Sequence, residues 1–212
     1  MIEIRKTDIF ATWLDGLKDI RARARILVRI ERLAMGNPGD VKPVGEGVSE
    51  MRIDYGPGYR VYFKKIGRVM IILLAGGDKR TQTRNIKTAI RIAKNVEDDS
   101  MRKTKTTPYD VSEHLRTPEE MAAYLEACIE EADGDAAFIA KALGDIARAK
   151  GMTQVARDAG MSRESLYKAL SGERNPGFDT ILKVMGALGL KLHAEAMLST
   201  SAMNSQRRVS VK

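Results

Sequence analysis

The chain has 212 residues, 43% of them hydrophobic, which suffices for one large domain or two small ones with real cores. No apolar stretch approaches the ~18 residues that span a membrane, and the first ten residues lack the basic-then-apolar order of a signal peptide. One cysteine and two histidines exclude an internal disulfide and leave no metal-ligand cluster. We therefore expect a cytoplasmic protein that uses no metal or other cofactor.

Positive charge is concentrated in the first half of the chain. The net charge is +8, and residues 1–100 hold 20 Lys and Arg against 13 Asp and Glu, whereas the remainder holds 16 against 15. Such a field favours a polyanion or an acidic protein as the partner. A merely soluble basic surface would give the same counts, so charge alone assigns no function.

Residues 1–98 are predicted to form an α+β domain in which helices pack on a small antiparallel sheet. Thr7 can cap the first helix, and the break Gly36-Asn37-Pro38-Gly39 ends the second. The expected order is β-α-α-β-β-β-α. These elements cover about residues 2–4, 8–17, 22–35, 49–55, 59–66, 69–75 and 81–96.

Basic and aromatic side chains should converge at the open face and the end of this sheet. Alternation along the strands puts polar residues on one face, and Gly76-Gly77 should let the backbone turn sharply at a strand end. Arginine and lysine would stabilise a pentavalent phosphate, tyrosine or aspartate would move protons, and Tyr55, Tyr59 or Tyr62 could stack a base. Cross-strand packing and a solvated basic face would explain the same residues. The candidate catalytic residues are Arg52, Arg60, Tyr62, Asp78, Lys79, Arg80 and Arg84.

These residues carry a family resemblance. The segments MRIDYGPGYRVYFKK (51–65) and ILLAGGDKRTQTRNIKTAIRIAK (72–94) resemble the HigB-like addiction module killer branch of the RelE/ParE superfamily, and the resemblance covers nearly all of residues 1–97. It implies a toxin that acts either as a ribosome-dependent mRNA endonuclease or as an inhibitor of DNA gyrase. Residues 1–100 contain no histidine, and no aromatic residue follows Phe63 in this domain, so no catalytic residue of the superfamily's nucleases transfers by position.

The second half is predicted to be helical. Residues 99–110 are polar and favour a linker, and the capping box at Thr117-Pro118-Glu119-Glu120 should begin a helix that runs to about residue 132. A second helix is expected at 136–150. A third is expected at 179–188, followed by a strand-like segment at 190–196. The serine-rich tail at 199–212 is predicted to be disordered.

Residues 152–172 have the spacing of a helix-turn-helix. Thr153 should cap its first helix, Gly160 should allow the positive φ of the turn, and Ser162 should cap the second helix. Arg163 would pair with guanine, whereas Gln154 or Lys168 would hold phosphates. A plain helical bundle could show a similar pattern. The candidate DNA-binding residues are Gln154, Ser162, Arg163, Glu164, Tyr167 and Lys168.

The segment from Gly144 to Leu192 is similar to the HigA-like addiction module antidote family, and the similarity extends over about residues 108–194. It implies an all-α, lambda-repressor-like domain at 111–198. Such a domain would neutralise the toxin half, in cis or within a domain-exchanged dimer, and would bind operator DNA as a homodimer to repress its own operon. The toxin's target would be the ribosome with its mRNA, or gyrase, and no membrane partner is expected. A natural fusion, a read-through product and an engineered tether all fit this sequence, and the chain could also act only as a repressor.

Overall fold

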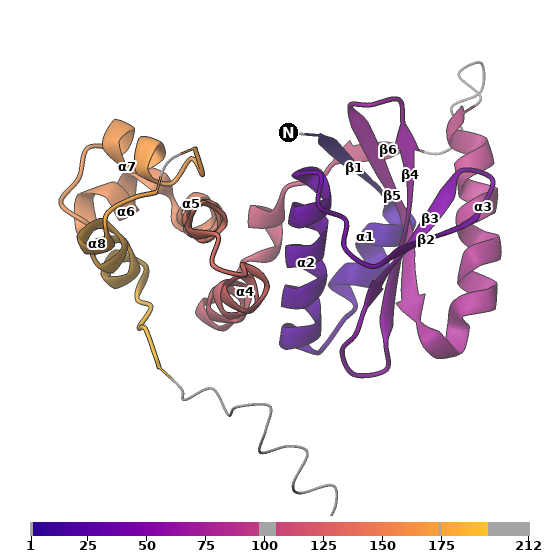
Figure 1. Ribbon diagram of the computed structural model, residues 1–212, viewed down its shortest axis with the longest axis horizontal. Helices are drawn as coiled ribbons and strands as arrows, with labels where there is room; N and C mark the ends of the chain where they lie inside the picture. Colours follow the sequence, from indigo (N-terminus) through magenta and orange to yellow (C-terminus); the bar gives the residue numbers. More distant parts are fainter. Residues whose placement is uncertain (1, 98–104, 174, 195–212) are drawn as a thin grey trace, which may run out of the picture.

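The computed structural model describes residues 2–97, 105–173 and 175–194 (Figure 1). In these residues the fold is mixed α and β: a six-stranded sheet with helices on both faces precedes a helical region. The predicted tail at 199–212 lies outside the described residues. A search of the described ranges finds no helix that combines the length and the apolar character needed to cross a membrane.

The first half supplies five of the six strands found in the described residues. One of them, β2, was not predicted, because its proline and its glycine are atypical of strands. Pro43 is tolerated because β2 lies at the sheet edge. The elements are β1 (Glu3–Thr7), α1 (Asp8–Asp15), α2 (Ile20–Ala34), β2 (Val41–Gly45), β3 (Val48–Ile53), β4 (Tyr59–Ile66), β5 (Met70–Asp78), the 3-10 helix η1 (Lys79–Thr81) and α3 (Gln82–Glu97).

The sheet is mixed, and the prediction of a purely antiparallel sheet is wrong. Its strand order is β2-β3-β4-β5-β1-β6. β1 runs parallel to β5, with Ile4 opposite Ile71, while the other neighbouring pairs are antiparallel. The excursion through α1 and α2 places β1 beside the last strand of the meander, and this long connection permits the parallel pairing.

The sixth strand comes from the segment that was predicted to be a linker. β6 (Thr106–Pro108) pairs antiparallel with β1, and the amide of Tyr109 continues the ladder by donating to the carbonyl of Ile4 over 3.0 Å. Polar composition alone predicted a linker, because the pairing partner lies about a hundred residues away in the sequence. The second half of the chain therefore completes the edge of the first half's sheet.

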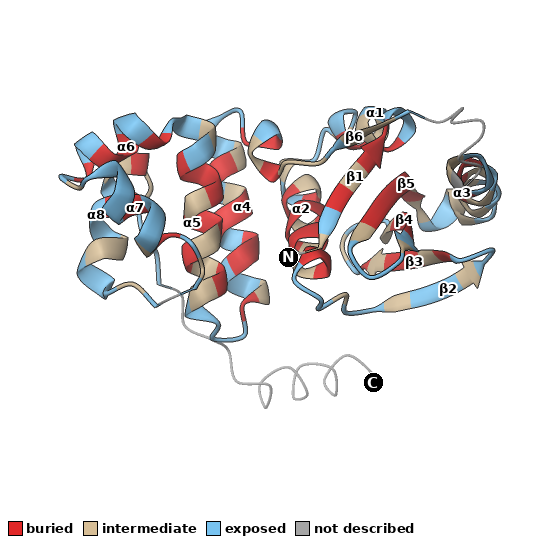
Figure 2. Cartoon of the chain, turned by 90° about the horizontal axis from the view of Figure 1, so that it is seen from above, coloured by how far each residue is buried: buried red, intermediate tan, exposed pale blue. Residues whose placement is uncertain are grey.

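Helices cover both faces of the sheet. α1 and α2 pack on one face, and α3 packs on the other over a separate apolar cluster that includes Tyr62, Leu74 and Ala89 (Figure 2). The predicted open face is therefore wrong. Ile86, Ala89, Ile90 and Ala93 form the apolar stripe of α3, and this stripe closes the face along which the polar strand residues alternate.

The second half is helical in its described residues beyond β6. Thr117 and Glu120 form the predicted capping box. Residues 190–194 form no strand, so the strand-like prediction at 190–196 is wrong for the residues that the structure describes. α4 packs directly on α2, which puts the helical region on the side of the molecule opposite α3 (Figure 1). The elements are the 3-10 helix η2 (Val111–His114), α4 (Pro118–Glu131), α5 (Ala136–Lys150), α6 (Met152–Asp158), α7 (Arg163–Ala169) and α8 (Phe178–Leu188).

Candidate functional site

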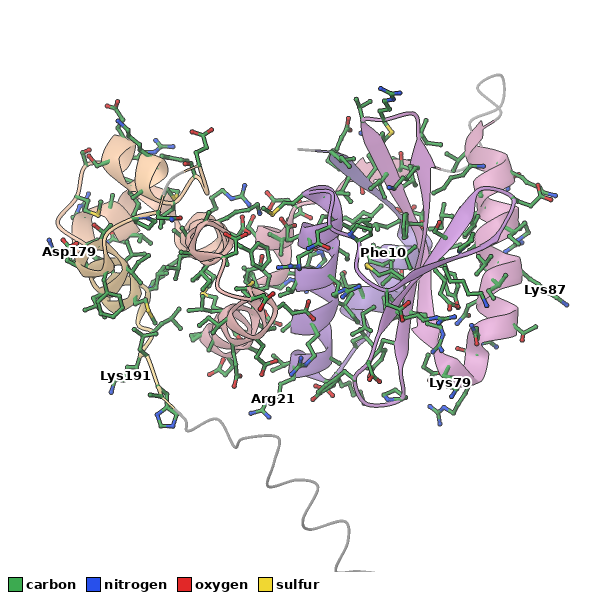
Figure 3. The ribbon with its side chains drawn as sticks, viewed as in Figure 1. Phe10, Arg21, Lys79, Lys87, Asp179 and Lys191 are labelled. Atoms are coloured by element: carbon green, nitrogen blue, oxygen red, sulfur yellow. The ribbon has the colours of Figure 1, made fainter. Side chains whose placement is uncertain are left out.

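A cavity of about 310 Å³ opens at the end of β5. It brings together three of the predicted catalytic residues, Asp78, Arg80 and Arg84, which lie close together in the sequence between the end of β5 and the start of α3. Lys79 lies between Asp78 and Arg80 in the chain but does not line the cavity, and its side chain is exposed (Figure 3). The side chains that line the cavity include Trp13, Tyr59, Asp78, Arg80, Arg84 and Asn85.

Two glycines shape the floor of the cavity. A Cβ atom on Gly76 would lie 2.0 Å from the Trp13 ring, and one on Gly77 would lie 1.7 Å from the Asn85 amide nitrogen. Neither glycine has a positive φ, and β5 continues through both of them to Asp78. The predicted sharp turn is therefore wrong: the glycines are needed because two side chains lie directly against the strand.

Asp78 caps the helical turn that follows the strand. Its carboxylate accepts from the backbone amides of Arg80 and Thr81 at 2.9 and 3.1 Å, and from the Arg80 guanidinium at 3.1 Å. Burial opposes ionisation, but these hydrogen bonds outweigh it and hold the pKa of Asp78 below its usual range. Asp78 is therefore ionised at neutral pH and is occupied in holding the backbone.

Tyr59 contributes a protonated hydroxyl to the cavity. Burial, followed by the charges of Asp19 and Asp78, raises the pKa of its hydroxyl. At neutral pH the hydroxyl thus keeps its proton and can donate a hydrogen bond to an oxygen bound in the cavity.

The remaining candidates gather around a carboxylate on the other face of the sheet. Glu50 is buried, and it accepts from Arg52 at 3.0 Å, from Tyr62 at 3.1 Å and from Gln82 at 2.8 Å. Arg60 lies 3.5 Å away. Burial would raise the pKa of Glu50, but the hydrogen bonds from Arg52, Gln82 and Tyr62 lower it. This cluster joins α3 to the sheet.

Tyr62 is inaccessible to a nucleobase, contrary to the prediction. Its exposed fraction is 0%, because α3 covers it, and burial raises the pKa of its hydroxyl well above the usual range. Sequence reasoning also missed Glu50, Trp13 and Asn85. A single glutamate in a strand does not indicate a functional role. Trp13 and Asn85 lie directly against Gly76 and Gly77, so this pair of adjacent glycines was the available clue to them.

α6 and α7 are joined by a tight turn in which Gly160 has a φ of +66°. Ser162 caps α7 as predicted, since its hydroxyl accepts from the amide of Ser165 at 3.0 Å. The predicted cap at Thr153 is wrong. α6 begins at Met152, one residue before Thr153, and directly follows Gly151, which caps the end of α5 with a φ of +105°.

The outer surface of this helix pair carries the predicted polar residues, and all six of them are exposed. The Arg163 guanidinium lies over the Tyr167 ring at 5.4 Å, and the Gln154 amide donates to Asp158 over 2.7 Å. Leu166 is the buried anchor of α7. α7 is therefore a short helix that is anchored through Leu166, and its polar side chains are directed outward.

The two halves of the chain meet through opposite charges. Arg23 on α2 pairs with Glu120, Arg25 with Glu130 at 2.5 Å, and Arg29 with Glu131 at 3.8 Å. Beside them, Lys6 on β1 pairs with Glu113 at 2.7 Å, Arg116 pairs with Asp15 at 2.8 Å, and the Arg32 guanidinium lies 5.2 Å from the Phe138 ring. A basic helix is thus covered by an acidic one.

A buried ionic cluster lies at the centre of this contact. The Lys141 amine on α5 lies 2.5 Å from Glu31 of α2 and 2.9 Å from Asp145, and Asp145 also accepts from Arg148 and from Tyr124. Burial favours the neutral amine, but Glu31 and Asp145 together raise the pKa of Lys141. Burial is the largest influence on Glu31 and raises its pKa. In the described residues, no group of three or more His, Cys, Asp and Glu side chains is arranged to hold a metal ion.

Comparison with known proteins identifies each half. Residues 12–97 match the family "Phage derived protein Gp49-like", and residues 105–196 match the family "Probable addiction module antidote protein". Two relatives from Haemophilus influenzae, both called "Uncharacterized protein", are 50% identical over 95 residues and 53% identical over 87 residues. These alignments cover 45% and 41% of this chain but 96% and 88% of the relatives. No solved structure matches.

The chain belongs to the addiction-module family. It joins a toxin-type, Gp49-like domain to an antidote domain, which we call the toxin half (residues 2–97) and the antidote half (residues 105–194). Each relative aligns along most of its own length with less than half of this chain, so a unit of this size also occurs as a separate protein.

Proposed function

We propose that the chain is a self-neutralised toxin–antidote fusion whose helix-turn-helix binds operator DNA and represses its own promoter. The interface supports this proposal: the antidote half adds β6 to the toxin sheet and lays acidic α4 on basic α2. Because both halves share one chain, the antidote is present at a high effective concentration at the toxin surface.

For the released toxin half we propose cleavage of mRNA at the ribosome. Arg80 and Arg84 at the cavity would stabilise the charge that develops on the phosphate. The 2′-hydroxyl beside the cleaved phosphate would attack the phosphorus and lose its proton to water, and the bond from phosphorus to the 5′-oxygen would break. Tyr59 would donate its proton to this leaving oxygen and regain one from water, while Trp13 would stack a base. Asp78 would hold Arg80 and the backbone in place through its cap.

A second candidate is inhibition of DNA gyrase by binding alone. One observation favours it: among the residues that line the cavity, none is poised to accept a proton. Asp78 has a lowered pKa and is committed to its cap, and Tyr59 holds its proton. A toxin that acts by binding needs no general base.

Separate expression of the two halves tests both proposed toxin activities, mRNA cleavage and gyrase inhibition. Residues 1–98 should stop growth, and residues 105–212 supplied from a second gene should restore it. Rapid loss of mRNA after induction would support the nuclease, whereas DNA damage with intact mRNA would support the gyrase inhibitor. Normal growth with residues 1–98 abundant and folded would contradict the toxin proposal.

For the helix-turn-helix, a gel shift with the chain's own upstream DNA is the direct measurement. Arg163→Ala should weaken specific binding about tenfold or more, since a base contact contributes roughly 1–3 kcal/mol of discrimination. Lys183→Ala removes an exposed charge from α8 and is the matched control. Equal binding by both variants would contradict the assignment of α7 as the DNA-reading helix.

We also propose that the repressor is a homodimer that pairs through α8. Phe178 and Leu182 lie one helical turn apart on this helix and are 66% and 48% exposed, which is unusual for large apolar side chains. Light scattering should give a dimer for the intact chain and a monomer for Leu182→Glu. A monomer in both cases would refute the pairing.

A further inference from the structure

The outer face of α3 carries a row of cations. Arg84, Lys87 and Arg91 follow one another at intervals of three and four residues, which places them within about 60° of arc on a helix. All three are exposed, and within the described part of the chain none of them forms an ion pair. Lys94 continues the row and lies 3.8 Å from Glu46. Figure 3 shows Lys87 directed outward from α3.

This row lies on the side of the toxin half that faces away from the antidote half. α4 packs on α2, and the sheet separates α2 from α3 (Figures 1 and 2). The described ion pairs between the halves involve β1, α1 and α2 on the toxin side, and none involves α3. Docking of the antidote therefore leaves the row accessible.

The row begins inside the cavity at the end of β5. Arg84 lines that cavity together with Arg80, and Lys87 and Arg91 extend the positive charge along the helix away from it. A chain of phosphates is the ligand that matches evenly spaced cations running outward from a phosphate-binding pocket. An acidic protein surface would match the charge but not this continuity.

We propose that the outer row of α3 is a docking surface for the backbone of single-stranded RNA, and that it stays open while the antidote is bound. The choice of RNA rests on the mRNA target proposed above. The intact chain then binds RNA through α3 without cleaving it, and it binds operator DNA separately through the helix-turn-helix at the opposite end of the molecule.

The test uses the full-length chain and a fluorescently labelled single-stranded RNA of mixed sequence, with binding followed by anisotropy across a salt series. Lys87→Ala/Arg91→Ala changes two exposed helical positions outside the cavity, and alanine favours the helix. Lys65→Ala/Arg68→Ala removes the same charge from exposed positions at the β4–β5 hairpin of the same domain, outside α3, and is the matched control.

We expect the α3 variant to bind RNA about tenfold more weakly, and the slope of log K against log salt to shrink by about 1.4, or 0.7 per lost contact with a single strand. The control should change binding by less than about twofold, and Arg163→Ala should leave it unchanged. Equal losses in the α3 variant and the control, loss through Arg163→Ala, or no RNA binding by the intact chain would overturn the inference. Weakened operator binding by the α3 variant with unchanged RNA binding would also overturn it, because the ligand would then be DNA.

These outcomes are separable from those of the nuclease proposal. If residues 1–98 leave mRNA intact while the α3 variant alone loses RNA binding, the nuclease proposal fails and the docking surface stands. If residues 1–98 cleave mRNA while the α3 variant binds RNA as tightly as the original chain, the docking surface fails and the nuclease stands.

Discussion

The toxin half has two basic helices on opposite faces of one sheet, and the antidote half covers only one of them. α2 gives Arg23, Arg25 and Arg29 to carboxylates of the antidote half, and it contributes Glu31 to the buried cluster around Lys141. α3 carries a similar row of cations but makes no described ion pair with the antidote half. The antidote thus recognises one specific face of the toxin half and not its positive charge as a whole.

The largest loss of stability should come from the buried ionic cluster around Lys141, where α5 meets α2. Lys141→Ala would leave the carboxylates of Glu31 and Asp145 close together without the amine between them, and loss of one partner from a buried ion pair costs about 3 kcal/mol or more. Urea unfolding followed by circular dichroism measures this loss. Lys150→Ala, at the exposed end of the same helix, should change stability by less than about 0.5 kcal/mol. Similar small changes in both variants would show that the cluster does not hold the halves together.

The same substitution on both helices compares them directly. Arg23→Met removes the partner of Glu120, and both side chains are nearly buried, at 12% and 11% exposed, so we expect a loss of about 2 kcal/mol. Arg91→Met on α3 should cost less than about 0.5 kcal/mol, because Arg91 is exposed and has no described partner. Unfolding curves of the two variants at one pH decide the matter. Equal losses would remove the distinction between the helices.

The two buried glutamates of the toxin half differ in the direction of their pKa shifts. Burial raises the pKa of Glu31, whereas hydrogen bonds from Arg52, Gln82 and Tyr62 overcome burial and lower that of Glu50. A lowered folded-state pKa contributes stability above the unfolded value of about 4.3, and this contribution is lost as the pH falls through the folded value.

Glu50→Gln should therefore cost about 1.5 kcal/mol at pH 7, because Arg52 loses its charged acceptor. The difference from the original chain should shrink progressively below about pH 4. Urea unfolding at a series of pH values measures both quantities. A cost that is constant down to pH 3 would show that ionised Glu50 does not secure α3 to the sheet.

Local signals were sufficient for much of the fold. Thr7, Thr117 and Ser162 each accept from an amide three residues onward, so the information for these caps lies within one turn of sequence. The strand Tyr59–Ile66 was predicted with its observed bounds, because turn glycines flank it. Asp78, Arg80 and Arg84 meet at one cavity for the same reason, as they follow directly from one strand.

Features that depend on distant partners could not be predicted in this way. β6 forms only because the edge of β1 is available, and nothing in Thr106–Pro108 itself distinguishes a strand from a linker. Alternation placed Tyr62 correctly on one face of the sheet but did not reveal that α3 covers that face. Gly76 was interpreted as a turn residue, whereas its role in β5 is to admit the ring of Trp13 from α1.

The smallest expected effect separates binding from stability on the uncovered helix. Arg84 and Lys87 are three residues apart, and Lys87 and Arg91 are four apart, so like charges face one another along the helix and weaken it. Lys87→Ala should therefore stabilise the chain by about 0.3 kcal/mol, aided by the helix propensity of alanine. Replicate urea unfolding resolves such a gain when the original chain and the variant are measured together. A loss above about 0.5 kcal/mol would show that Lys87 has a stabilising partner in the folded chain. A row of cations that weakens its own helix is better explained by a polyanion that binds it than by any contribution to folding.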